Sequence, residues 1–234
     1  MIKLENWEVV GWNHAIRGMR NPMNSWAKSD TEYKEPLITP GAYRDLKVPI
    51  IGPNDHELMM KLAKGGSVHA KYRRMIAVYV DITAPLYWWK EFDTYKVGTV
   101  ANSCSTMHKI HAFELSRDDC SCERLTSRSM VVLESVLSEV NFWRSIYING
   151  GRWGGVDYEP RDKRAWVQMI QLLPSSYNQK RTVMLNYEVL AGIYPMRKNH
   201  KLDEWHVFCE WIESLPWSEI IIGEKEKNDE IQTV

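Results

Sequence analysis

The segment from residue 98 to residue 105 concentrates side chains that could bind a small polar ligand. Its residues include Gly98, Thr99, Asn102, Ser103 and Ser105. Hydroxyl and amide groups both donate and accept hydrogen bonds, so a loop of this kind can bind a ribose, a phosphate or the edge of a heterocycle. A solvated polar turn has the same composition, and these residues alone leave both interpretations open.

A metal site is a second chemistry that the residue spacing allows. Cys104, His108 and His111 stand at i, i+4 and i+7, which in a helix would present three zinc ligands on one face. No second cysteine or histidine pair at metal spacing accompanies them in the sequence. We therefore expect no bound metal and interpret the three residues as the polar face of a helix, with a metal-binding protein that uses them as the less favoured alternative.

Other familiar catalytic motifs are missing or stand in the wrong context. Cys120-Ser121-Cys122 lacks the two-residue spacer of the usual redox and metal pairs, and we interpret it as an inert pair in an exposed loop. The glycine-rich stretch 150–155 follows an expected helix rather than a strand, which does not suit a phosphate loop. No serine stands in a nucleophile-elbow pattern. The sequence therefore contains no obvious nucleophile or catalytic triad.

Length, composition and charge limit the class of protein. The chain has 234 residues, 44% of them hydrophobic and 26% charged, which favours one globular domain. Thirty basic residues balance thirty acidic ones, whereas nucleic-acid-binding proteins normally carry a basic excess. Neither a secretory signal nor an apolar run of bilayer length is present, and four cysteines do not make a disulfide scaffold. We expect a soluble cytoplasmic protein with a small-molecule partner, and neither a nucleic-acid nor a membrane partner.

The elements that must position the polar loop follow from periodicity. Residues Arg74 to Ile82 alternate apolar with other side chains and predict a strand. Pro85 suits the first position of a helix that runs toward Tyr95. Residues 97–105 are small and polar and predict a loop, and another helix is expected to begin near Thr106.

The rest of the chain predicts a mixture of strands and helices, and hence an α+β fold. Residues 1–53 are rich in turn residues and predict short strands and loops. Asn54 and Glu57 form a capping box that predicts a helix up to Gly65-Gly66. Helical spacing predicts further helices over 133–147, 166–173, 183–196 and 203–214. We expect a single domain over residues 1–222, a flexible polar tail at 223–234, and a packing role for the eleven tryptophans.

The segment around the polar loop resembles the flavin-dependent thymidylate synthases. That family has a strand, then Ala-Pro, then a helix leading to R-H-R-x-x-S, followed by an N-x-x-S-x-R loop. Here Ala84-Pro85-Leu86-Tyr87 aligns without gaps up to Thr99, and Asn102-Ser103-Cys104-Ser105 matches N-x-x-S after one extra residue. Counting back from Ala84, His69 falls on the family's Gly-His histidine.

A second match lies far downstream and follows the family's C-terminal pattern of Leu-Pro, Asn, Arg and His-x-x-x-Glu. The matching residues are Leu173-Pro174, Asn186, Arg197, His200 and Glu204, with one residue missing before His200. Pro216-Trp217 is similar to the family's closing Pro-Trp. The resemblance covers two stretches of the chain, residues 54–110 and 165–220.

The chain departs from the family pattern at the arginines that contact flavin and dUMP. Thr94-Tyr95-Lys96 replaces the signature R-H-R, and Met107, Ile170 and Glu188 stand at three further arginine positions, whereas Arg197 is kept. The candidates to replace the missing cations are Lys71, Arg73, Arg74, Lys109 and Arg181. The sequence is thus similar to a divergent member of the family.

The resemblance implies a mainly antiparallel sheet packed with helices, assembled as a homotetramer. It implies a methyltransferase of nucleotide biosynthesis, which moves a one-carbon unit from methylenetetrahydrofolate to C5 of dUMP with FAD as cofactor and NADPH as co-substrate. The implied flavin-binding residues are His69, Tyr95, Lys96, Thr99 and Asn186. The implied nucleotide-binding residues are Glu91, Asn102, Ser103, Ser105 and Arg197, of which Ser105 and Arg197 are the catalytic candidates.

The missing arginines leave two alternatives open. One is a flavin- or nucleotide-binding relative without synthase activity that serves as a sensor or regulator. The other is an enzyme that modifies a different pyrimidine nucleotide, such as dCMP.

Overall fold

A computed structural model describes residues 1–33 and 49–223 of the chain. The chain forms two compact units. Unit 1 comprises Met1–Lys3, Ile82–Thr94 and Ala101–Thr182, and unit 2 comprises the described residues of Leu4–Asp81, Tyr95–Val100 and Val183–Val234. A four-stranded sheet has residues in both units, and its strand order is β1 (Lys3–Val10), β4 (Ala77–Pro85), β8 (Asn178–Asn186) and β5 (Val100–Ser103).

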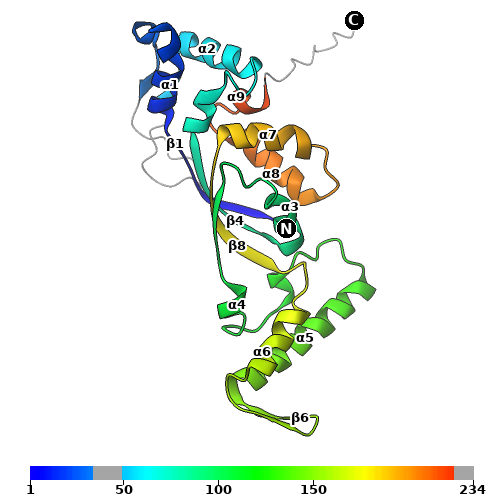
Figure 1. The fold of residues 1–234 in the computed structure, drawn as a ribbon. Coiled ribbons are helices and arrows are strands. Elements are labelled where there is room, and N and C mark those ends of the chain that lie inside the picture. Colours follow the sequence, from blue (N-terminus) through cyan, green and yellow to red (C-terminus); the bar gives the residue numbers. More distant parts are fainter. Residues whose placement is uncertain (34–48, 224–234) are drawn as a thin grey trace, which may run out of the picture. The chain divides into compact units, whose positions relative to one another are not determined.

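Unit 2 combines short elements from the N-terminal third of the chain with the C-terminal helices. The N-terminal elements are α1 (Trp12–Arg20), the 3-10 helices η1 (Asn21–Met23) and η2 (Trp26–Lys28), β2 (Glu32–Tyr33), β3 (Pro49–Ile50), α2 (Pro53–Lys64) and the 3-10 helix η3 (Lys71–Met75). The C-terminal helices are α7 (Tyr187–Arg197), α8 (Asp203–Ser214) and α9 (Glu219–Ile222). Strands β2 and β3 pair antiparallel, and α7 packs against both α8 and α9 (Figure 1).

Unit 1 is built around two helices joined by a hairpin. Its elements are α3 (Leu86–Phe92), α4 (Thr106–Lys109), the 3-10 helix η4 (Arg117–Asp119), α5 (Ser127–Asn149), β6 (Gly151–Trp153), β7 (Val156–Tyr158) and α6 (Lys163–Leu172). Strands β6 and β7 pair antiparallel between α5 and α6, which lie side by side (Figure 1).

The core of unit 1 lies between α5 and α6. Leu133, Leu137 and Val140 are buried at helical spacing on α5, and they pack in one cluster with Ala165 and Met169 of α6. Burial of a leucine or valine side chain stabilises the folded chain by about 1.5–3 kcal/mol. The helix predicted over 133–147 is therefore confirmed as part of a longer one.

Aromatic side chains fill much of the core of unit 2. The Trp12 and Tyr187 rings meet edge-on with 5.4 Å between centroids. The Phe208 ring lies 5.7 Å from that of Trp205 and 5.3 Å from that of Trp211. Such ring pairs contribute about 0.5–1.5 kcal/mol beyond the area that they bury. The packing role predicted for tryptophan is confirmed for these three residues.

The N-terminal region contains more helix than its turn residues indicate. The prediction of short strands and loops over residues 1–53 is wrong for α1, whose buried face includes Ala15, Ile16 and Met19. The capping box at Asn54 is also wrong. The Asp30 carboxylate instead accepts hydrogen bonds from the backbone N–H groups of Asn54 and Asp55, at 2.9 and 3.0 Å. A residue distant in sequence thus supplies the cap.

The structure changes the predicted bounds of two elements, the strand that precedes the polar loop and the helix that follows β8. The predicted loop 97–105 contains the short exposed strand β5, and the strand predicted from Arg74 begins at Ala77 as β4. The helix predicted over 183–196 is wrong in its first turn, because β8 continues to Asn186. Val183 and Leu185 are fully buried at a spacing of two, which fits a strand.

The mixture of helices and strands confirms the α+β prediction. The single domain over residues 1–222 stays a prediction, and the predicted tail lies outside the described residues except for Gly223. Among the described helices, none combines the length and the apolar character that crossing a membrane requires.

Candidate functional site

The loop from Tyr95 to Val100 lies against the first turn of α7 in unit 2. Gly98 has a φ of +81°, and a Cβ at this position would stand 2.9 Å from Val189 Cγ2 and 3.3 Å from Asn186 Nδ2. The positive φ and the close approach both favour glycine. The Thr99 hydroxyl donates to the Tyr95 carbonyl at 2.5 Å and closes the loop on itself.

Asn186 connects β8 to α7 and serves as the N-cap of that helix. Its Oδ1 accepts hydrogen bonds from the backbone N–H groups of Glu188 and Val189, at 3.1 and 3.0 Å. Two N–H groups that the helix leaves unpaired are satisfied in this way. The cap holds the Asn186 amide beside Gly98, at a fixed place next to the loop.

A pocket of about 400 Å³ opens beside this loop and the start of α7, and we call it the Asn186 pocket. Its lining residues are Ser67, Arg74, Val97, Gly98, Asn186, Glu188 and Val189. Arg74 Nη2 donates to Ser67 Oγ at 3.3 Å, so two of the polar lining groups are already linked. Guanidinium, amide and hydroxyl groups in one pocket can bind a phosphate or the edge of a heterocycle.

The Glu188 carboxylate in this pocket is paired with Arg73. Arg73 Nε donates to Glu188 Oε2 at 2.7 Å, and Arg73 Nη1 donates to the Ile220 carbonyl at 3.1 Å. The two charged side chains are 9% and 16% exposed. Removing one partner of such a pair leaves an uncompensated charge, at a cost of about 3–5 kcal/mol. Glu188 stands where the flavin-dependent thymidylate synthases carry an arginine, and Arg73 places a cation beside that position.

Arg197 is held against two aromatic rings of unit 2. Its Nε donates to the Tyr95 hydroxyl at 2.7 Å, and its guanidinium carbon lies 4.5 Å from the Trp205 ring centroid and 5.5 Å from that of Tyr95. Cation–π contacts contribute about 0.5–2 kcal/mol each. Tyr95 from the altered signature motif and Arg197 from the second motif are therefore brought together. Their contact orients a planar cation of the kind that binds carboxylate or phosphate.

Four of the five predicted flavin-binding residues lie outside the lining of the Asn186 pocket, namely His69, Tyr95, Lys96 and Thr99. His69 is exposed, and its ring covers Gly65, where an added Cβ would meet it at 3.2 Å. Lys96 is exposed, and its carbonyl accepts from the Thr99 N–H at 3.4 Å. Among the five predicted flavin-binding residues, Asn186 alone lines this pocket.

Four predicted nucleotide-binding residues belong to unit 1. Glu91 lies on α3, and Asn102 and Ser103 are exposed on β5. Ser105 is the N-cap of α4, and its Oγ accepts from the His108 N–H at 3.2 Å. A hydroxyl oxygen that accepts in this way still has its own hydrogen to donate. The helix predicted near Thr106 is confirmed, although it is only one turn long.

The helical face proposed for a zinc site does not form. Helix α4 ends at Lys109, so Cys104 precedes it and His111 follows it. The His111 ring lies 5.0 Å from the Tyr147 ring, and burial, together with nearby cationic side chains, lowers the pKa of its imidazole. Within residues 1–33 and 49–223, no three His, Cys, Asp or Glu side chains are grouped to hold a metal ion.

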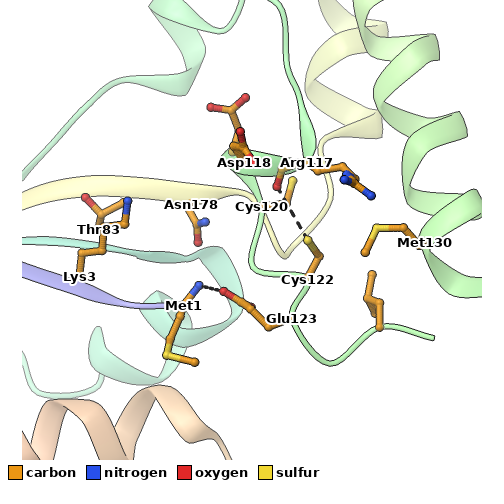
Figure 2. A pocket seen from close by; sticks show the side chains of 12 residues that line it. Met1, Lys3, Thr83, Arg117, Asp118, Cys120, Cys122, Glu123, Met130 and Asn178 are labelled. Carbon is orange, nitrogen blue, oxygen red and sulfur yellow. Dashed lines mark hydrogen bonds and ion pairs between the residues drawn. The ribbon is translucent and has the colours of Figure 1, made fainter. Parts of the chain in front are cut away.

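Unit 1 has a pocket of about 760 Å³ that contains none of the predicted site residues (Figure 2). Cys120 and Cys122 line it, and Cys122 Sγ lies 3.8 Å from the Arg117 carbonyl. Burial raises the pKa of the Cys120 thiol to about 11, which makes it a poor nucleophile at neutral pH. The exposed-loop interpretation is wrong for Cys120 and Ser121, which are both buried.

Sequence reasoning missed several residues of the Asn186 pocket and of the Arg197 site. The sequence indicates Arg74 only as one of five candidates to replace the missing cations. For Ser67 it predicts no binding role, because the residue merely follows Gly65-Gly66. Trp205 follows the second motif directly, yet its role beneath Arg197 depends on tertiary packing.

Comparison with solved structures shows that the chain has the fold of the flavin-dependent thymidylate synthases. One similar structure is thymidylate synthase X (ThyX) from Helicobacter pylori with FAD and dUMP. Its TM-score is 0.63 and its identity 13%, over 93% of this chain and 95% of that chain. Another is the flavin-dependent thymidylate synthase ThyX from Helicobacter pylori complexed with FAD and dUMP. It has a TM-score of 0.61 and 13% identity, over 93% of this chain and 96% of that one.

No family model and no curated protein matches the sequence. At 13% identity the structural similarity establishes the fold, and the predicted fold class is confirmed.

The donor set of the Asn186 pocket fits part of a flavin dinucleotide. Arg74 and Ser67 offer charged and neutral donors suited to phosphate oxygens, and the Asn186 amide can pair with a heterocycle edge. About 400 Å³ is at the small end for ligand pockets, so it would hold one portion of a dinucleotide rather than the whole cofactor.

Proposed function

We propose that the chain is a flavin-dependent thymidylate synthase-like enzyme that transfers a one-carbon unit from methylenetetrahydrofolate to C5 of dUMP. The observation that carries the proposal is the Asn186 pocket. A residue matched by the family motif caps α7 there and lies beside Gly98 and Arg74. The fold supports the proposal, because the similar ThyX structures contain FAD and dUMP.

In this proposal FAD binds through unit 2. Asn186 and Arg74 would hold it at the pocket, and the neighbouring residues that the resemblance assigns to it are His69, Tyr95, Lys96 and Thr99. When bound, FAD in its reduced form would supply the hydride for the reaction, and NADPH would be the source of that reducing power. The chain's own contribution is to hold the reactants in place, which suits a site without a protein nucleophile.

The nucleotide would be bound by Glu91, Asn102, Ser103, Ser105 and Arg197, with Ser105 and Arg197 as the catalytic candidates. Arg197 is the proposed phosphate ligand, because Tyr95 and Trp205 hold its guanidinium in one orientation. A charge-assisted hydrogen bond to phosphate contributes about 1.5–3 kcal/mol. Following the resemblance, we also propose a cytoplasmic homotetramer.

A relative that binds flavin or nucleotide without synthase activity is the second candidate. It is favoured by Thr94-Tyr95-Lys96, because the aromatic Tyr95 there bonds to Arg197 and only Lys96 keeps a cation. An enzyme acting on a different pyrimidine nucleotide would share this site, and a panel of nucleotides would identify it.

The decisive experiment combines flavin absorbance of the purified protein with thermal stabilisation by dUMP. A ligand that binds the native state raises its stability, so both signals are expected. Arg74→Gln should weaken FAD binding about tenfold, equivalent to one charge-assisted hydrogen bond. Arg152→Gln on the exposed β6 strand is the matched control and should leave FAD binding unchanged.

Rescue of a thymidine-requiring strain then separates the two candidates. Growth establishes the synthase, whereas bound flavin without growth favours the relative that lacks it. Absence of flavin and of any shift with millimolar dUMP would refute both assignments.

A further inference from the structure

A smaller pocket in unit 2 has features of a binding site that the proposed function does not use. Its volume is about 260 Å³, and we call it the Arg20 pocket. It is lined in part by Arg17 and Arg20 of α1, by Trp26, and by Tyr33 of β2. It shares no lining residue with the Asn186 pocket.

Arg20 is almost completely buried and has a donor group without a partner among the described residues. The residue is 4% exposed, and its Nη2 is buried with no hydrogen-bond acceptor among the described residues. Its Nε donates to Asp55 Oδ1 at 2.6 Å, and its Nη1 makes a long contact to the Ser25 carbonyl at 3.4 Å. A buried charged donor left unpaired is unfavourable, so an acceptor from outside the chain would be stabilised there.

Asp55 orients the Arg20 guanidinium through Nε and accepts no hydrogen bond from Nη2. Its second oxygen, Oδ2, already accepts from the hydroxyls of Ser29 and Thr31 at 2.7 Å and from the backbone N–H groups of Asp30 and Thr31 at 3.1 Å. Together with the bond from Arg20 to Oδ1, these bonds fix the carboxylate in place. It balances the charge of Arg20, and Arg17, one turn earlier on α1, adds a second cation to the described lining of the pocket.

Two aromatic side chains are exposed at the same pocket. Trp26 is 49% exposed and Tyr33 is 42% exposed, although large aromatic groups are usually buried. Trp26 Nε1 donates to Asn21 Oδ1 at 2.8 Å, which fixes the indole ring. Desolvation and the charge of Asp55 raise the pKa of the Tyr33 phenol above its ordinary value, at which it is already neutral and able to donate at pH 7. A planar ligand could pack against these rings at little entropic cost.

We infer that the Arg20 pocket binds a small aromatic anion, a carboxylate or a phosphate monoester on a single ring. Its anionic oxygens accept hydrogen bonds from Arg20 and Arg17, and its ring packs against Trp26 and Tyr33. The pocket is slightly smaller than the range typical of drug-sized ligands, which suits one ring and one anionic group. None of the residues that the proposed function assigns to flavin or nucleotide lines this pocket.

Isothermal titration calorimetry of the full chain tests the inference with four probes: phenyl phosphate, benzoate, inorganic phosphate and benzyl alcohol. We expect binding of phenyl phosphate, of benzoate, or of both, and the stronger of the two identifies the anionic group. Inorganic phosphate and benzyl alcohol each lack half of the recognised chemistry and should bind at least about tenfold more weakly.

Variants at the rim keep the test independent of folding. Arg17→Gln and Trp26→Leu change exposed side chains, and each should weaken the better probe about tenfold. Arg152→Gln is the control for loss of a surface cation and should bind normally. Arg20→Lys keeps a charge beside Asp55 but removes Nη2, and it should lose binding while its melting curve shows that it is folded.

Two results would overturn the inference. One is no heat with phenyl phosphate or with benzoate at millimolar concentration, and the other is equal affinity in the wild type and both rim variants. Flavin absorbance measured on the same samples reports the proposed function separately, because none of these variants touches the Asn186 pocket.

Discussion

Replacement of Asp55 by asparagine should strongly destabilise unit 2. Asp55 has no exposed surface, and its side chain accepts hydrogen bonds from Arg20, Ser29, Thr31 and the Asp30 N–H. Asparagine keeps the shape but exchanges one acceptor oxygen for an NH₂ donor. In either orientation of the amide, that donor faces another donor, and Arg20 loses its counter-charge.

The expected loss of stability is about 3–5 kcal/mol, the cost of breaking a buried ion pair by removing one partner. That is a substantial part of the total stability of a typical domain, which is about 5–15 kcal/mol. Urea unfolding followed by tryptophan fluorescence measures it, and the midpoint should fall by about 2 M for a slope near 2 kcal/mol per M. Asp157→Asn, 79% exposed, is the control and should change stability by only a few tenths of a kcal/mol.

The pH dependence of the free energy of unfolding gives an independent check on the role of the Asp55 carboxylate. Burial alone would raise the pKa of Asp55, but hydrogen bonds from Thr31, Ser29 and Arg20 outweigh it and lower the pKa below its usual value of 3.8. The stabilisation is therefore present above the unfolded-state pKa and is lost as the pH falls toward the folded-state pKa. The Asp55→Asn variant should lack this acid-dependent loss. A change of less than about 1 kcal/mol at neutral pH would refute the reasoning.

Three other changes test the remaining interactions. Tyr95→Phe removes the acceptor of Arg197 Nε and should weaken dUMP binding about tenfold in calorimetry, with equal affinity counting against the proposed role. Gly98→Ala places a Cβ 2.9 Å from Val189 Cγ2 at a positive φ, so we expect a loss of about 1–2 kcal/mol in urea unfolding; an unchanged midpoint would contradict it. The Cys120 thiol, with its pKa of about 11, should react with iodoacetamide at pH 8 only after unfolding, and mass spectrometry of the native protein would reveal early modification.

Local periodicity was sufficient to predict the elements that bury a regular face. Leu133, Leu137 and Val140 repeat at helical spacing, and α5 follows them to its end at Asn149. Val183 and Leu185 repeat at a spacing of two directly before a helical segment, so the two periods overlap and the boundary at Asn186 was missed. Caps supplied from a distance are hidden from such reasoning, as the role of Asp30 at the start of α2 demonstrates.

The site was predictable in part because two of its residues belong to sequence motifs. The place of Asn186 and Tyr95 in those motifs selects them, and in unit 2 Asn186 lines the Asn186 pocket and Tyr95 contacts Arg197. The partners that give them that geometry come from elsewhere in the chain. Trp205 beneath Arg197 and Arg74 in the pocket are joined to the motifs only by tertiary contacts, which spacing does not encode.

The Arg73–Glu188 pair also constrains how this chain can change over generations. Each partner alone would be a largely buried charge without compensation, so a single substitution at either position passes through a poorly folded intermediate. A variant with a cation at position 188 would need a matching acid at position 73. The two positions are therefore expected to vary together among relatives, with opposite charges at positions 73 and 188.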